Sequence, residues 1–180
     1  EIYQSRLCSA DEAVKCIKSG DNVVFQHCAG EPAVLVDALV RNAANYKNVQ
    51  IGHMVSLGKG EYTKPEYQEH FRWNGWFCGA STRKCVEEGH GDYTPVFFHE
   101  VPILMRKGVF PVDVAMIMVS PPDEHGYCCT GVSSDYTMQA IESAKIVLAQ
   151  VNDQMPVVFG DTFVHVSKID KFVEASHPLP

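Results

Sequence analysis

The sequence has 180 residues, 46% of them hydrophobic, and a formal net charge of −7 at pH 7 from 15 basic and 22 acidic side chains. This length suffices for one sizeable domain with its own core, without disulfide or metal staples. The negative charge argues against nucleic acid and anionic membranes as main partners, and the longest apolar run, about six residues, is far shorter than the roughly 20 that cross a bilayer.

Hydrophobic patterning predicts strands and helices that alternate along the chain. The predicted strands cover residues 22–27, 49–57, 76–80, 93–98, 112–119 and 145–151. The predicted helices cover residues 9–20, 81–88, 101–107 and 134–143, with one more that opens at residues 31–32. This repeated order is typical of an α/β fold with an open, mostly parallel sheet and helices on both faces.

The segment 58–74 lacks such a pattern. It is polar, rich in aromatic residues and without sustained periodicity, which predicts an irregular excursion over the edge of the sheet. Its aromatic side chains either form part of a surface that faces a partner or fold back on the core of their own domain. These side chains are Tyr62, Tyr67, Phe71 and Trp73.

The seven cysteines show no Cys-x-x-Cys pair, which favours reduced thiols over a disulfide framework or a zinc ribbon. The first residues lack the pattern of a secretory signal, so we expect a cytoplasmic protein. The eight histidines have no metal-ligand spacing, and no glycine-rich nucleotide loop is present. We therefore expect no metal and no dinucleotide cofactor.

The turn from His27 to Pro32 follows the first predicted strand and opens the next helix. Unpaired backbone N–H groups at such a helix start can hold a carboxylate or an acyl oxyanion. The alternative is a tight connection in which Gly30 supplies backbone freedom and Pro32 fits the first helical turn. His27 and His53 end adjacent predicted strands, so we expect both imidazoles at one edge of the sheet, where they could orient a substrate.

The loop 120–131 follows the strand predicted at residues 112–119, where open α/β sheets place their ligands. Ser120, Asp123 and His125 could suggest a hydrolase triad. Residues this close in one stiff loop rarely form a nucleophile with its base, and no G-x-S-x-G elbow is present. We therefore expect a rigid connection.

Five segments of the sequence, taken together, indicate a protein family more specifically than any single motif does. The chain resembles the N-terminal half of the family of 4-hydroxybutyrate CoA-transferases and acyl-CoA:acetate CoA-transferases, over nearly its whole length. The segments that carry the resemblance are HCAGEPAVLVDAL, HMVSLGKGEY, FCGASTRKCVEEGHGDYTPVFFHEVP, PVDVAMIMVSPPDEHGYCCTGVSSDY and AKIVLAQVNDQMPVVFGDTFVHVSKID.

The resemblance implies two similar α/β domains that face each other across a cleft for the CoA ester. A glutamate of the C-terminal domain attacks the thioester, and an acyl-glutamyl anhydride is followed by a glutamyl-CoA thioester. The nucleophile is then expected beyond residue 180, so no role as nucleophile is assigned to Glu31, Glu61, Glu100 or Glu124. Residues 1–174 would be the N-terminal domain, and residues 175–180 the start of a linker to the catalytic domain.

The resemblance also implies coenzyme A as a substrate, no further cofactor, a short-chain carboxylate such as acetate as acceptor, and a homo-oligomer for the complete protein. Applied to this sequence, it suggests an acyl pocket lined by His27, Gly30, Glu31, Pro32, His53 and Met54. Cys28 is a departure, because the family more often has a small residue without a thiol there. The acyl group would be 4-hydroxybutyryl or butyryl. The alternatives are an acyl-CoA hydrolase and a stand-alone binding or assembly module.

Overall fold

A computed structural model describes residues 1–180 and contains a seven-stranded sheet in the order β4-β3-β2-β1-β5-β7-β9. Every neighbouring pair of strands in this sheet is parallel. In sheet order the strands are β4 (Asp92–Tyr93), β3 (Phe71–Gly75), β2 (Val49–His53), β1 (Asn22–Phe25), β5 (Val114–Val119), β7 (Ile146–Val151) and β9 (Lys171–Glu174). A separate antiparallel pair joins β6 (Tyr127–Cys129) to β8 (Phe163–His165).

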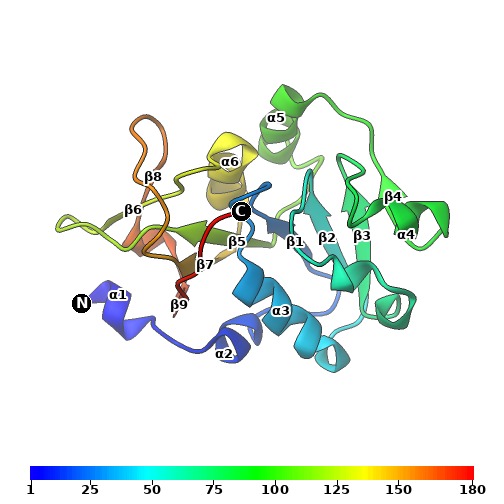
Figure 1. Ribbon diagram of the computed structural model, residues 1–180, viewed down its shortest axis with the longest axis horizontal. Coiled ribbons are helices and arrows are strands. Elements are labelled where there is room, and N and C mark those ends of the chain that lie inside the picture. The colour runs from blue at the N-terminus through cyan, green and yellow to red at the C-terminus, as the bar shows by residue number, and fades with distance from the viewer.

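Helices cover both faces of the large sheet (Figure 1). Helices α2 and α3 pack on one face, and α5 and α6 pack on the other. The helices are α1 (Ile2–Ser5), α2 (Ala10–Val14), α3 (Ala33–Arg41), α4 (Arg83–Glu87), α5 (Val101–Arg106) and α6 (Asp135–Ser143). The predicted α/β class, with an open parallel sheet between helices, is confirmed. No helix has the length and apolar character needed to span a membrane.

Alternating strand side chains build two cores, one on each face of the sheet. Val23 and Phe25 of β1 pack with α2 and α3, whereas Val24 of the same strand packs on the side of α5 and α6. All six residues of β5 are buried, as expected for a central parallel strand that is covered on both sides.

The segment 58–74, which is rich in aromatic residues, was the least predictable part of the chain. The prediction of a strand at residues 76–80 is wrong, because the strand in this region is β3, which lies five residues earlier. Phe71 and Trp73 point into the core while Arg72 and Asn74 alternate with them. Tyr62 is also buried, so this segment folds onto its own domain and does not form an exposed aromatic surface.

Several predicted elements are shorter than expected. Strand β2 ends at His53 and not at residue 57, and β4 has two residues where the prediction extended to residue 98. Helix α2 ends at Val14, because the following N–H groups bond to the carbonyl three residues back and not four. The Ile17 N–H, for example, donates to the Val14 carbonyl at 3.1 Å. Ser9 caps the start of this helix, since its Oγ accepts from the Glu12 N–H at 3.2 Å.

Candidate functional site

The turn after β1 is held on both sides of His27, by strand β5 and by the segment that follows β2. The Gln26 N–H donates to the Met116 carbonyl at 3.0 Å, and the Cys28 N–H donates to the Val55 carbonyl at 2.9 Å. Cys28 has the left-handed backbone, with φ 56°, that glycine was predicted to supply. The backbone at His27 is therefore fixed from both flanks, and its side chain leaves the sheet at the carboxyl end of β1.

Gly30 is needed for space and not for a left-handed backbone. Its φ is not positive, but a Cβ placed on it would lie 2.7 to 2.8 Å from side-chain atoms of Gln26. Gln26 cannot move away easily, because it is 2% exposed and its amide is fully engaged. Its Nε2 donates to the carbonyls of Thr130 and Ser133 at 3.0 and 2.9 Å, and its Oε1 accepts from the Met118 N–H at 2.6 Å.

The turn leaves two of its five backbone N–H groups unpaired. The N–H groups of Gly30 and Glu31 donate to carbonyls within the turn. The Val34 N–H donates to Gln150 Oε1 at 3.0 Å, and Pro32 has no N–H to offer. His27 and Ala29 carry the two N–H groups of the turn that make no hydrogen bond within the chain, so these are the backbone donors left for a ligand.

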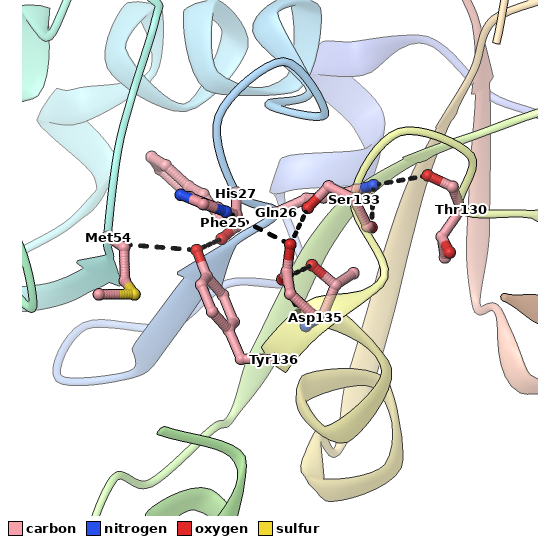
Figure 2. A network of polar contacts seen from close by, with 9 residues as sticks. Phe25, Gln26, His27, Met54, Thr130, Ser133, Asp135 and Tyr136 are labelled. Carbon is pink, nitrogen blue, oxygen red and sulfur yellow. Dashed lines mark hydrogen bonds and ion pairs between the residues drawn. The ribbon is translucent and has the colours of Figure 1, made fainter. Parts of the chain in front are cut away.

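His27 pairs with Asp135, the first residue of α6, across the carboxyl edge of the sheet (Figure 2). His27 Nδ1 lies 3.3 Å from Asp135 Oδ2. The carboxylate is itself held: Ser133 Oγ donates to Oδ2 at 2.5 Å, and the N–H and hydroxyl of Thr137 each donate to Oδ1 at 3.1 Å. The pair is partly open, because the two side chains are 18% and 19% exposed.

Asp135 stays a carboxylate in this setting. Burial alone would raise its pKa, but the hydrogen bonds from His27, Ser133 and the Thr137 N–H outweigh that effect, and the net shift of the Asp135 pKa is downward. An ionised carboxylate beside Nδ1 favours the imidazole tautomer that carries its proton there.

Two aromatic rings frame the imidazole of His27. The Phe98 ring lies edge-on with its centroid 5.0 Å away, and the Tyr136 ring lies at 5.8 Å. The Tyr136 hydroxyl donates to the Phe25 carbonyl at 2.9 Å, and the Met54 N–H donates to that hydroxyl at 3.4 Å. Tyr136 thus ties the ends of β1 and β2 together beneath the His27–Asp135 pair (Figure 2). An open cavity of 560 Å³ adjoins the pair and is lined by Phe98, His99, Pro102, Asp135 and Tyr136.

His53 ends β2 beside β1, as predicted, but it is 1% exposed. Trp73 Nε1 donates to His53 Nε2 at 2.9 Å, so this nitrogen is an acceptor and the ring is neutral, with the Nδ1 proton directed to the Met54 carbonyl at 3.2 Å. The Tyr62 hydroxyl lies 2.7 Å from the same Nε2. Burial is the main reason that the pKa of His53 falls to about 4.

Glu31 lies at the other side of the turn and is 8% exposed. Burial raises the pKa of its carboxyl, while hydrogen bonds from Ser56 and the Gly58 N–H lower it by less. Glu31 is therefore better suited to line a pocket as a polar group than to act as a nucleophile. It borders a cavity of 210 Å³ whose lining also includes Cys28, Ala29, Ala33, Leu57, Gly58, His177, Pro178 and Pro180.

The loop 120–131 has no triad. The Ser120 hydroxyl bonds to backbone groups of Pro121 and Cys129, and Asp123 accepts from the backbone N–H groups of His125 and Tyr127. These contacts make a rigid connection, as expected.

Sequence reasoning missed Gln26, Ser133, Asp135 and Tyr136, which position His27. The predicted helix at residues 134–143 was a usable signal, because its start follows β5 and so faces the same edge of the sheet as His27. The site as a whole can bind and orient a ligand and hold a proton on an imidazole. It contains no side chain that is both exposed and activated as a nucleophile.

Comparison with known proteins assigns this chain to a family. Residues 1–179 match the family described as Acetyl-CoA hydrolase/transferase N-terminal domain. The 4-hydroxybutyrate coenzyme A transferase of Clostridium kluyveri is 56% identical over 179 residues, which cover 99% of this chain and 42% of that protein. The butyryl-CoA:acetate CoA-transferase of Anaerostipes caccae is 38% identical, over 99% of this chain and 41% of that protein.

Solved structures agree. The 4-hydroxybutyrate CoA-transferase of Porphyromonas gingivalis superposes with a TM-score of 0.84 at 38% identity, covering 99% of this chain and 41% of that one. RipA from Yersinia pestis superposes with a TM-score of 0.93 at 29% identity, covering 99% of this chain and 44% of that one. The chain thus spans about two fifths of the length of these relatives. It belongs to the acetyl-CoA hydrolase/transferase family and corresponds to that family's N-terminal domain.

Proposed function

We propose that this chain is the N-terminal domain of a CoA-transferase that moves CoA between a short-chain acyl-CoA and a carboxylate. The observation that carries the proposal is the 56% identity with a 4-hydroxybutyrate coenzyme A transferase across 99% of the chain. The acyl group would be 4-hydroxybutyryl or butyryl and the acceptor acetate, by analogy with the names of the relatives. Coenzyme A is then a substrate and not a bound cofactor.

In this proposal the chain supplies one wall of the cleft. His27, Gly30, Glu31, Pro32 and Met54 form or support that wall at the carboxyl ends of β1 and β2. His53 supports it from behind, because its ring is enclosed in the core. The nucleophilic glutamate lies outside residues 1–180 and closes the cleft from a C-terminal domain, with residues 175–180 as the start of the connection. The complete protein is a homo-oligomer of the cytoplasm.

The chemistry of CoA transfer suits a domain that lines the cleft without supplying the nucleophile. A carboxylate attacks a thioester well only when it is positioned and desolvated, which a second domain across the cleft provides. The displaced thiolate must stay bound so that it can attack the glutamyl anhydride. The neutral and apolar groups around the 210 Å³ cavity, such as Ala29, Ala33 and Leu57, suit an acyl chain.

A direct test follows the exchange in the complete protein. Purified enzyme with 4-hydroxybutyryl-CoA or butyryl-CoA should form acetyl-CoA only when acetate is added, and the rate should depend on both reactants. A panel of acids then ranks the acceptors. Loss of acyl-CoA at the same rate without any acid would contradict transfer as the main reaction, and ligand binding with no turnover would favour the binding module.

A further inference from the structure

The segment that follows β9, the expected start of a linker, is fixed to the sheet. The Ala175 N–H donates to the Val151 carbonyl at 2.9 Å and prolongs the pairing of β9 with β7. The side chain of Asn152 then holds the backbone of His177. Its Nδ2 donates to the His177 carbonyl at 2.9 Å, and its Oδ1 accepts from the His177 N–H at 3.4 Å. Residues 175–178 therefore form an anchored segment, which we call the strap.

A second amide holds the side chain of His177 and, at the same time, the start of α3. The Val34 N–H donates to Gln150 Oε1 at 3.0 Å. Since Oε1 is the acceptor, Nε2 of the same amide is the donor toward His177 Nε2, 2.8 Å away. The imidazole is then neutral and carries its proton on Nδ1, which donates to the Pro178 carbonyl at 2.9 Å. One amide thus connects the strap to the helix that follows the turn 27–32.

Gln150 and Asn152 are both 0% exposed, and no step of the proposed reaction uses either amide. Every other residue of β7 is apolar. A buried amide lowers stability unless its hydrogen bonds are made, so two of them at the end of a buried strand need partners. Both amides find such a partner in His177. The two side chains are therefore placed to hold the strap.

The strap crosses the carboxyl edge of the sheet toward the turn after β1. Figure 1 shows this red segment leaving β9 and turning toward the middle of the sheet. His177 and Pro178 line the 210 Å³ cavity together with Cys28 and Glu31 of the turn. The chain thus leaves the domain beside the residues that the proposed function assigns to the acyl pocket.

We propose that His177 is a positioning residue for CoA transfer, because it fixes the point from which the following domain extends over the cleft. This inference rests on the proposed function, in which a glutamate of that domain attacks the thioester. The carboxylate oxygen bonds to the thioester carbonyl carbon, the carbon–sulfur bond breaks, and the thiolate leaves with the electron pair. A displacement of the attacking group by about 1 Å can lower such a rate about 100-fold.

The test compares His177 variants of the complete protein in the transfer of CoA from butyryl-CoA to acetate. H177L removes the acceptor for the Gln150 amide, and H177N is polar but too short to reach it. In both variants kcat should fall at least about tenfold while KM for butyryl-CoA stays within about twofold, because the nucleophile is displaced and the binding groups of the turn remain. H177Q can accept the same hydrogen bond through its side-chain oxygen and should keep most of the wild-type kcat.

Hydrogen exchange measures the strap independently of activity. The backbone N–H groups of residues 175–177 should exchange faster in H177L and H177N than in wild type or H177Q, because the strap is released from the sheet. The matched control is H125L, which changes an exposed histidine of the loop 120–131. It should leave both the exchange of the strap and kcat as in wild type.

Three results would overturn this inference and leave the proposed function intact. They are a higher KM with unchanged kcat in H177L and H177N, the same loss of kcat in H177Q as in H177L, and unchanged exchange of the strap in H177L and H177N. Absence of transfer in wild type with every acyl-CoA and acid tried would overturn the proposed function itself.

Discussion

Gly30 lies where a side chain of any size would meet Gln26, whose amide connects β1 to the chain that leads into α6. We expect Gly30→Ala to lower the free energy of unfolding by about 1–3 kcal/mol, because the added methyl group overpacks a site that cannot give way. Urea unfolding measures this cost. The matched control is Gly79→Ala, whose Cβ would meet nothing closer than 4.0 Å. Equal stability of the two variants would contradict the packing role of Gly30.

His53 makes stability depend on pH. Its pKa is about 4 in the folded protein against the ordinary histidine value of 6.5, so the unfolded chain binds the proton more readily. The contribution of His53 is complete above pH 6.5 and is lost as pH falls toward 4, by roughly 3 kcal/mol in all. Urea unfolding at several pH values should show this slope in wild type and a flatter one in His53→Gln.

The control for His53 is His125→Gln, which removes a side chain that is 74% exposed. Its slope between pH 6.5 and 4 should match that of wild type. A slope that is the same in all three proteins would show that His53 is not the residue responsible.

Asp113 joins the beginnings of three strands and shows what holds the sheet at its amino end. Its carboxylate accepts from the Asn22 N–H at 2.8 Å, from Asn22 Nδ2 at 3.0 Å and from Lys145 Nζ at 2.7 Å. We expect Asp113→Ala to cost about 1–3 kcal/mol, since it leaves a strand-end N–H without its charged acceptor. Thermal unfolding should show little change in Asp153→Ala, an exposed position. A similar small change in both variants would argue against this connection.

Long apolar segments were predictable from the sequence, and short strands were not. The run that forms β5 is continuous, so its position was evident to within two residues. β3 was assigned too late, because Phe71 and Trp73 alternate with polar residues directly after a charged excursion. β6, β8 and β9 have three or four residues each, too few for a periodic signal.

The residues of the candidate site also differ in how far a local sequence pattern marks them. His27 was singled out because it ends a predicted strand, whereas Met54 was suggested by the family resemblance. Asp135 is 108 residues from His27 in the chain, and they meet because β5 pairs directly with β1. That order of strands, and not any local pattern, creates the pair.

The molecule as a whole leaves large apolar side chains in solvent. Phe159 is 90% exposed, Phe97 is 71% exposed and Val157 is 60% exposed. In the proposed function these lie in a domain that faces a second one, and exposed apolar groups of this kind favour contact over hydration. We expect the 180-residue chain to self-associate despite its charge of −7.

Light scattering across a concentration series measures this association. Phe159→Ser and Phe97→Ser should reduce it, whereas Lys107→Ser, an exposed polar position, should not. The separately expressed C-terminal half should also reduce it by covering the same surface. A chain that stays monomeric at every concentration and does not respond to its other half would contradict the prediction.

The central claim is that this chain binds and orients a thioester but does not supply the nucleophile. Its most direct test is the formation of acetyl-CoA from 4-hydroxybutyryl-CoA and acetate, measured side by side for the 180-residue chain and the complete protein. The account predicts exchange by the complete protein and none by the chain alone. Sustained exchange by the verified 180-residue chain would contradict it.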